Sequence, residues 1–222
     1  SRRMGKVFDE AGTKEYMRIY YAMVKLVDDQ VGKILAQLEE MGEMDNTVIV
    51  FTADHGDMNG GHGMLWKSTK SFYEEVVKVP LLIRYPKLFK PQQSELAVDT
   101  TDLMPTLLTL AGHPVPEQAQ GQNLVPFLTG EKPASAAREY SFCERVDRHP
   151  EGDRQILPKT RGSFMVRGKG YKYVRYRDGE EFMYDLNKDP AEVENVVNKS
   201  EYVDQRNEMI RHMYAWLNRT GW

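Results

Sequence analysis

The feature that most constrains the fold is a long apolar stripe near the start of the chain, followed at once by an apolar run. Between residues 14 and 41, apolar side chains recur at spacings of three and four, which predicts one long helix with a single apolar face. The stripe consists of Met17, Tyr20, Val24, Val27, Val31, Ile34, Leu38 and Met41. Gly42 stands where a helix-terminating glycine belongs. Residues 47–52 are β-branched and apolar on both faces, so they predict a strand covered on both sides, as in a parallel sheet flanked by helices.

The rest of the chain predicts a change of architecture near residue 135. Sequence patterns indicate three further helices, at residues 71–77, 101–111 and 202–217. They indicate further strands at residues 79–85, 164–167, 171–176 and 181–186. We therefore expect an α/β part over residues 1–135. A small α+β unit with an antiparallel sheet and a terminal helix should follow over residues 136–222.

Composition excludes several classes of protein. The 222 residues include 30 Lys and Arg against 33 Asp and Glu, and this net charge of -3 does not favour a nucleic-acid-binding protein. The sequence has no run of 18 apolar residues, so it predicts no membrane-spanning helix. Cys143 is the one cysteine, which excludes an internal disulfide and predicts a small, buried apolar side chain.

An Asp-His pair comes directly after the strand at residues 47–52. Asp54 and His55 stand beyond its carboxyl end, where ligands bind in open α/β sheets, and Gly56 permits a sharp turn that lets both face one site. A carboxylate and an imidazole are both ligands for divalent cations. For the dipeptide alone, a helix cap followed by a surface histidine is the simpler interpretation.

A glycine-rich loop with a histidine and a lysine follows the pair. His62 stands between Gly61 and Gly63, which free the main chain to approach a ligand. Lys67 follows five residues later and can place a point charge on an anionic group. A flexible surface loop with a solvated lysine is the alternative interpretation.

The order of these segments is more specific than any of them alone. Asp-Asn-Thr-Val-Ile-Val-Phe-Thr-Ala-Asp-His-Gly at residues 45–56 precedes Gly-His-Gly…Trp-Lys at 61–67. Further matching segments lie at residues 27–32, 73–81, 102–112, 121–128 and 183–190. Over residues 14–219 the chain resembles the carboxyl-terminal half of a sulfatase of the alkaline-phosphatase-like superfamily. The resemblance implies part of an alkaline-phosphatase-like sandwich, with a mostly parallel sheet and helices on both faces.

The resemblance also implies roles for individual residues. Asp54 and His55 match the second pair of metal ligands in the family, and the ion is expected to be Ca²⁺, with Mg²⁺ or Mn²⁺ as alternatives. Lys67 matches a lysine that contacts the sulfate, and His62 matches a histidine common in that loop, so both are candidate catalytic residues. Gly61 replaces an acidic residue that is usual in the family. Asp102 matches the start of a family helix, where a capping role is the better interpretation.

The nucleophile of the family has no counterpart in this sequence. Sulfatases make a formylglycine from a Cys or Ser in a Cys/Ser-x-Pro/Ala-x-Arg motif of their amino-terminal half. Cys143 is followed by Glu144 and Arg145 and lacks that pattern. We therefore expect the formylglycine in a missing amino-terminal part, and we expect this chain alone to be inactive.

The sequence is compatible with three functions. The leading one is the carboxyl-terminal fragment of a sulfatase, with a sulfated small molecule or glycan as its substrate. The alternatives are a phosphonate monoester or phosphodiester hydrolase of the same superfamily, and a non-catalytic chain. The expected partner is the missing amino-terminal half or another copy of the chain. The basic side chains of the tail hairpin could face a polyanion, although a solvated face is the simpler expectation. Most sulfatases are periplasmic, secreted or lysosomal, and the sequence leaves the compartment open, the cytoplasm included.

Overall fold

The computed structural model describes residues 9–67, 72–146 and 162–221 of the chain. It divides into two compact units, Ser1–Pro91 and Gln92–Trp222. The boundary expected at residue 135 concerns the sulfatase catalytic domain and its tail, and it stays a prediction.

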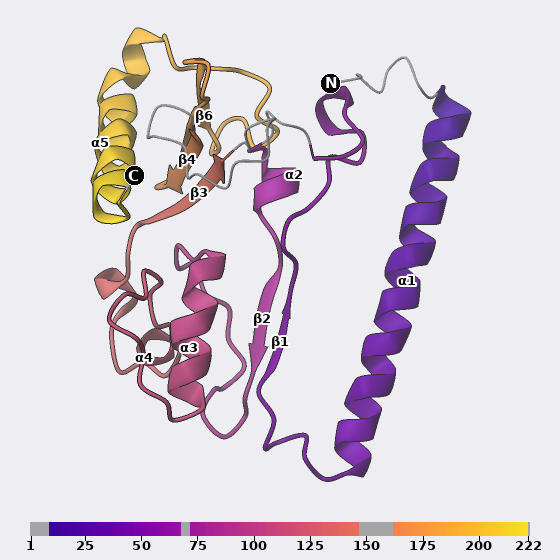
Figure 1. The fold of residues 1–222 in the computed structure, drawn as a ribbon. Coiled ribbons are helices and arrows are strands. Elements are labelled where there is room, and N and C mark those ends of the chain that lie inside the picture. The colour runs from indigo at the N-terminus through magenta and orange to yellow at the C-terminus, as the bar shows by residue number, and fades with distance from the viewer. Residues whose placement is uncertain (1–8, 68–71, 147–161, 222) are drawn as a thin grey trace, which may run out of the picture. The chain divides into compact units, whose positions relative to one another are not determined.

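The helices and strands follow the order expected from the sequence (Figure 1). The first unit contains α1 (Glu10–Glu40), β1 (Ile49–Thr52), a 3-10 turn (Gly61–Gly63), α2 (Glu74–Val77) and β2 (Leu81–Arg84). The second unit contains, in its helical part, a 3-10 turn (Thr100–Asp102), α3 (Leu103–Leu110), α4 (Val125–Leu128) and a 3-10 turn (Ala134–Ala136). Its remaining elements are β3 (Tyr140–Val146), β4 (Gly162–Gly168), β5 (Tyr171–Arg175), β6 (Glu181–Asp185), a 3-10 turn (Ser200–Tyr202) and α5 (Val203–Arg219).

The long helix is confirmed, and its ends follow from local chemistry. Asp9 begins α1 by accepting a hydrogen bond from the N–H of Gly12 at 2.8 Å, one turn earlier than the apolar stripe predicts. Gly42 ends it with a φ of 70°, and the N–H of Glu43 then reaches back to the carbonyl of Leu38 at 3.0 Å. This is the Schellman arrangement that a glycine makes possible after a helix.

The described residues leave the apolar surface of α1 uncovered. None of its 31 residues is buried. Its large exposed apolar side chains are Ile19, Tyr21, Met23, Val24, Leu26, Val27 and Ile34. A helix with this much exposed apolar surface requires a partner to lie on.

The strand expected at residues 47–52 is present as β1, but it is not covered on both sides. β1 pairs with β2 in the antiparallel direction, with Val50 opposite Ile83. The side chains of β1 are half-buried, and Phe51 is exposed. The expectation of a doubly covered strand is therefore wrong for the residues described, because β1 has one described neighbour and no helix packed on both faces. The α/β part does precede a small α+β unit with an antiparallel sheet, as the predicted fold class requires.

The second unit has a compact core between its sheet and its last helix. The sheet has the order β3-β4-β5-β6, and every pairing is antiparallel. The core combines sheet side chains such as Tyr140, Val166, Tyr173 and Met183 with Met209, Met213 and Leu217 of α5. The spacing of those α5 residues places them on one face of the helix. β3 was not predicted from the sequence, although Tyr140 and Phe142 alternate with Ser141 and Cys143 as in a strand with one buried face.

Among the helices of the described residues, none is long and apolar enough to cross a membrane.

Candidate functional site

Asp54 and His55 lie just beyond β1 on a segment that is fixed to α2. The N–H of Gly56 donates to the carbonyl of Val76 at 2.8 Å. A Cβ at position 56 would lie 1.9 Å from the carbonyl oxygen of Glu75, so only glycine lets the two main chains approach this closely. A bend is present at Asp54, and the bond from Gly56 to Val76 anchors the Asp-His pair against α2.

The ring of His55 is oriented by its own main chain. Nδ1 lies 2.9 Å from the carbonyl oxygen of Gly56. Because a carbonyl oxygen only accepts, Nδ1 carries the ring proton and Nε2 presents a lone pair. Nε2 lies 3.5 Å from Oδ2 of Asp54. The imidazole lone pair and the Asp54 carboxylate thus face a common region.

Asp54 is held in its charged form. Oδ1 of Asp54 accepts the N–H of His55 at 2.9 Å. That hydrogen bond is the largest cause of a pKa of the Asp54 carboxyl below its ordinary value. The group is solvent-exposed, so it is available to a ligand.

The pair has the chemistry of half a metal site. Metal-binding histidines donate their second ring N–H to a carbonyl or carboxylate, and His55 already makes that bond to Gly56. Divalent cations take six or more oxygen or nitrogen ligands, some of them water. No cluster of three or more His, Cys, Asp or Glu side chains occurs among the described residues. Asp54 and His55 supply donor types that suit a divalent cation, and in this structure the Lys67 amine lies against Nε2 of His55.

The glycine-rich segment forms a closed loop with His62 at its tip. Two main-chain hydrogen bonds close it, from Asn59 to Leu65 at 2.9 Å and from Gly60 to Met64 at 2.8 Å. Four residues of the loop have left-handed φ values: Asn59 at 46°, Gly60 at 106°, His62 at 50° and Gly63 at 68°. Left-handed backbone is strained for Asn and His, and such strain concentrates at functional sites.

The closed loop returns Lys67 to the Asp-His pair. Oδ1 of Asp57 accepts the main-chain N–H of Lys67 at 3.0 Å across the base of the loop. The side-chain amine of Lys67 then contacts Nε2 of His55. The structure therefore brings together Asp54, His55 and Lys67, three of the four residues singled out in the sequence.

His62 makes a separate contact. Its ring stacks on Tyr73 with centroids 3.8 Å apart and an interplanar angle of 13°. Beside it, a Cβ on Gly61 would lie 2.8 Å from Oε1 of Glu75, so the missing side chain leaves space that this carboxylate occupies. Sequence reasoning assigned no role to Asp57 or Tyr73, and the only signal for Asp57 was its place two residues after His55.

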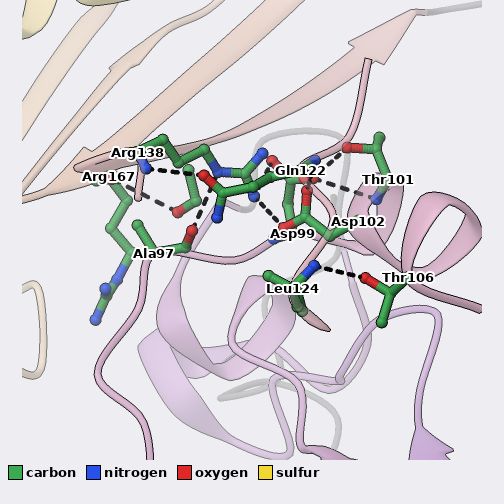
Figure 2. A network of polar contacts seen from close by, with 10 residues as sticks. Ala97, Asp99, Thr101, Asp102, Thr106, Gln122, Leu124, Arg138 and Arg167 are labelled. Carbon is green, nitrogen blue, oxygen red and sulfur yellow. Dashed lines mark hydrogen bonds and ion pairs between the residues drawn. The ribbon is translucent and has the colours of Figure 1, made fainter. Parts of the chain in front are cut away.

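A second polar cluster, in the other unit, is structural (Figure 2). Asp102 is fully buried, and its carboxylate accepts hydrogen bonds from the N–H of Asp99 at 3.0 Å and the N–H of Gln122 at 2.6 Å. Arg138 pairs with Asp102 at 2.5 Å and with Asp99 at 3.0 Å. Burial raises the pKa of Asp102, while Arg138 opposes that shift. The cap at this helix start is Asp99, which accepts the N–H of Thr101, and Asp102 completes the capping box by accepting the N–H of Asp99. Asp102 additionally ties two loops together.

The basic strands of the tail do not form a free anion-binding face among the residues described. Lys172 is buried in an ion pair with Glu192 at 2.8 Å. Lys169 pairs with Glu139 and Glu208, and Arg175 contacts Tyr214.

Cys143 on β3 is half-buried rather than fully buried as expected. Burial raises the pKa of its thiol to about 11, so the unreactive thiol form dominates at neutral pH.

Comparisons with known proteins agree with the segment order. The model of the Sulfatase family matches residues 2–113, and that of N-sulphoglucosamine sulphohydrolase, C-terminal, matches residues 60–219. The chain is 35% identical over 214 residues to N-acetylglucosamine-6-O-sulfatase of Bacteroides thetaiotaomicron. That match covers 93% of this chain and 36% of the relative.

Solved structures show the same fold. One was determined in complex with its substrate D-glucosamine-2-N,6-O-disulfate. It has a TM-score of 0.79 at 30% identity, and the match covers 99% of this chain and 44% of the other. Phosphonate monoester hydrolase of Agrobacterium radiobacter has a TM-score of 0.79 at 33% identity. That match covers 91% of this chain and 41% of the hydrolase. The chain thus spans less than half the length of each of these proteins.

Proposed function

Because the chain belongs to the sulfatase family, we propose that it forms the carboxyl-terminal part of an enzyme that hydrolyses sulfate esters. The observation that carries this proposal is the convergence of Asp54, His55 and Lys67 at the base of one closed loop. All three come from segments that resemble sulfatase motifs.

Each of these residues has a role that its chemistry supports. Asp54 and His55 would hold a divalent cation, with Ca²⁺ as the first candidate and Mg²⁺ or Mn²⁺ as alternatives. Such an ion supplies electrostatic stabilisation to an anionic group in transfer. Lys67 would place its ammonium on the sulfate and on the charge that develops in the transition state. His62, at the tip of the loop and held by Tyr73, is a candidate for proton transfer to the leaving alcohol.

The nucleophile would come from outside this chain. In the family it is a formylglycine, which supplies the oxygen that attacks sulfur. The thiol of Cys143 is no substitute, since it lies on a strand of the tail sheet and its pKa is raised.

The substrate class is proposed from the relatives. Both the N-acetylglucosamine-6-O-sulfatase and the structure that binds D-glucosamine-2-N,6-O-disulfate act on sulfated amino sugars by name. We propose a sulfated sugar as the substrate of this chain as well.

The remainder of such an enzyme would also cover the first unit. The exposed apolar side chains of α1, together with Phe51 of β1 and Leu82 of β2, offer a surface that the rest of a longer polypeptide or another copy of the chain would bury.

A substrate panel on the complete product of the gene tests the proposal. It would contain glucosamine 6-sulfate, an unsaturated uronate 2-sulfate and 4-nitrophenyl sulfate, each with and without EDTA. We expect turnover of at least one sulfated sugar, loss of turnover with EDTA, and recovery with Ca²⁺. Absence of sulfate release from all three would contradict the proposal.

A second candidate is favoured by one specific comparison. The phosphonate monoester hydrolase has a higher sequence identity than the structure that binds D-glucosamine-2-N,6-O-disulfate, at the same TM-score. N-acetylglucosamine-6-O-sulfatase matches at a higher identity still, 35%, so this candidate remains the second one. A phenylphosphonate ester in the panel separates the two, because a phosphonate hydrolase would prefer it to every sulfate.

A further inference from the structure

We propose that Asp57 is a positioning residue that sets the Lys67 amine against His55. This inference rests on the proposed function, because it names the residue that orients the proposed sulfate-contacting lysine. It is carried by one juxtaposition: the Asp57 carboxylate holds the main chain of Lys67, and the side chain of Lys67 holds His55.

Paired hydrogen bonds close the glycine-rich loop around His62. One main-chain hydrogen bond joins Asn59 to Leu65 and another joins Gly60 to Met64, so the two are arranged symmetrically about His62. The bond from the N–H of Lys67 to Asp57 lies two positions further out and is also symmetric about His62, and here the acceptor is a side-chain oxygen. The base of the loop therefore depends on one carboxylate.

The main chain that carries Asp57 is held in place on both sides. Gly56, its neighbour, is bonded to Val76 and lies against the carbonyl of Glu75. On the other side, Tyr16 donates its hydroxyl to Oδ1 of Asn59 at 3.0 Å, which ties the loop to α1. A carboxylate on an anchored main chain can impose a position on a partner ten residues away.

The hydrogen bond to Asp57 fixes the main chain of Lys67. Lys67 has a long, flexible side chain, and its ammonium reaches a chosen point only if its main chain is fixed. With the Asp57 bond in place, the ammonium contacts Nε2 of His55, beside the Asp54 carboxylate. Without that bond, Lys67 would be free to leave the site.

A double-mutant cycle on the complete gene product tests the inference. We expect Asp57→Ala to lower kcat/KM by about 10- to 100-fold, mainly through kcat, as removal of an orienting partner does. Asp57→Asn keeps an acceptor oxygen and should restore most of that loss. In a Lys67→Ala background, Asp57→Ala should have little further effect. An equal loss in both backgrounds, or an Asn variant as impaired as the Ala variant, would overturn the inference.

A second readout does not depend on activity. Acetylation of Lys67 by acetic anhydride, followed by mass spectrometry across pH, reports how far its amine is protected. Asp57→Ala should remove the protection seen in the wild type, and Asp57→Asn should retain it, with Lys87 as an internal reference. Unchanged acetylation of Lys67 in Asp57→Ala would overturn the inference. Normal kinetics in Lys67→Ala would instead overturn the proposed role of Lys67, whatever the acetylation shows.

Asp45→Ala is the matched control. Asp45 makes an exposed ion pair with Arg84 at 2.8 Å in the same unit, away from the loop. It should leave both kcat/KM and the acetylation of Lys67 unchanged.

Discussion

A Cβ placed on Gly56 would lie 1.9 Å from the carbonyl oxygen of Glu75, closer than any real contact allows. The Asp-His pair is therefore positioned by a main-chain approach that every other residue type would disrupt.

Gly56→Ala should destabilise the chain and displace the candidate site. We expect a loss of about 1–3 kcal/mol, typical of forcing an extra carbon into a packed region. Urea denaturation monitored by circular dichroism measures it. Gly32→Ala is the control, since a Cβ there meets nothing within 4 Å. It should stabilise α1 by about 0.5–1 kcal/mol. Equal effects of the two substitutions would contradict the steric argument.

Lys67→Ala in the complete gene product should lower kcat/KM by on the order of 10² or more. A charge directed at the reacting group in a dry site contributes a few kcal/mol to the transition state. Steady-state kinetics with the preferred substrate provide the measurement. Near-normal kinetics would show that Lys67 is a solvated loop residue.

Asp102→Ala should be among the most destabilising substitutions in the second unit. It leaves Arg138 and the N–H groups of Asp99 and Gln122 without their buried acceptor. Breaking a buried ion pair from one side costs about 3–5 kcal/mol. The midpoint of thermal unfolding should fall accordingly. Asp45→Ala, which removes an exposed pair, should change stability by less than about 1 kcal/mol.

Glu208 gives a pH-dependent contribution with a definite sign. It accepts the hydroxyl of Tyr140 at 2.7 Å and the amine of Lys169 at 3.0 Å, and these bonds lower its pKa from the model-compound value of 4.5. A lowered carboxyl pKa adds stability above the unfolded pKa, and that stability is lost as pH falls through the folded pKa. Glu208→Gln should therefore lose about 1 kcal/mol at pH 7, after allowance for solvent screening. The difference should shrink as pH falls below 4.5 and Glu208 becomes protonated, as urea titrations at pH 7 and in the acidic range would show. A constant difference across this range would contradict the assignment.

The exposed face of α1 should make the isolated 222-residue chain bind hydrophobic dyes and self-associate. Replacing Val24 and Val27 by Lys removes two exposed apolar side chains and should reduce both properties. Dye fluorescence and analytical ultracentrifugation measure them. In the complete gene product the same changes should lower stability, because the face would be covered there. If these substitutions leave the stability of the complete protein unchanged, nothing packs on this part of α1.

The sequence by itself determined those features that depend on local periodicity and local backbone chemistry. The stripe from Met17 to Met41 and the glycine at position 42 define the course and the end of α1, which begins one turn earlier than the stripe. The alternation in the tail predicts β4, β5 and β6. The order of the motifs around Asp54 and Lys67 predicted the sulfatase family, because each segment retains its residue types and spacing.

Only the tertiary structure decided which segments meet. The direction of β2 beside β1, and hence the exposure of Phe51, depends on contacts that no local pattern encodes. β3 escaped prediction because its alternation is short and carries Glu144 and Arg145 within it. The bond from Asp57 to Lys67 and the stacking of His62 on Tyr73 arise only when the loop closes. Such contacts join residues about ten apart through left-handed turns, whose geometry a linear sequence does not specify.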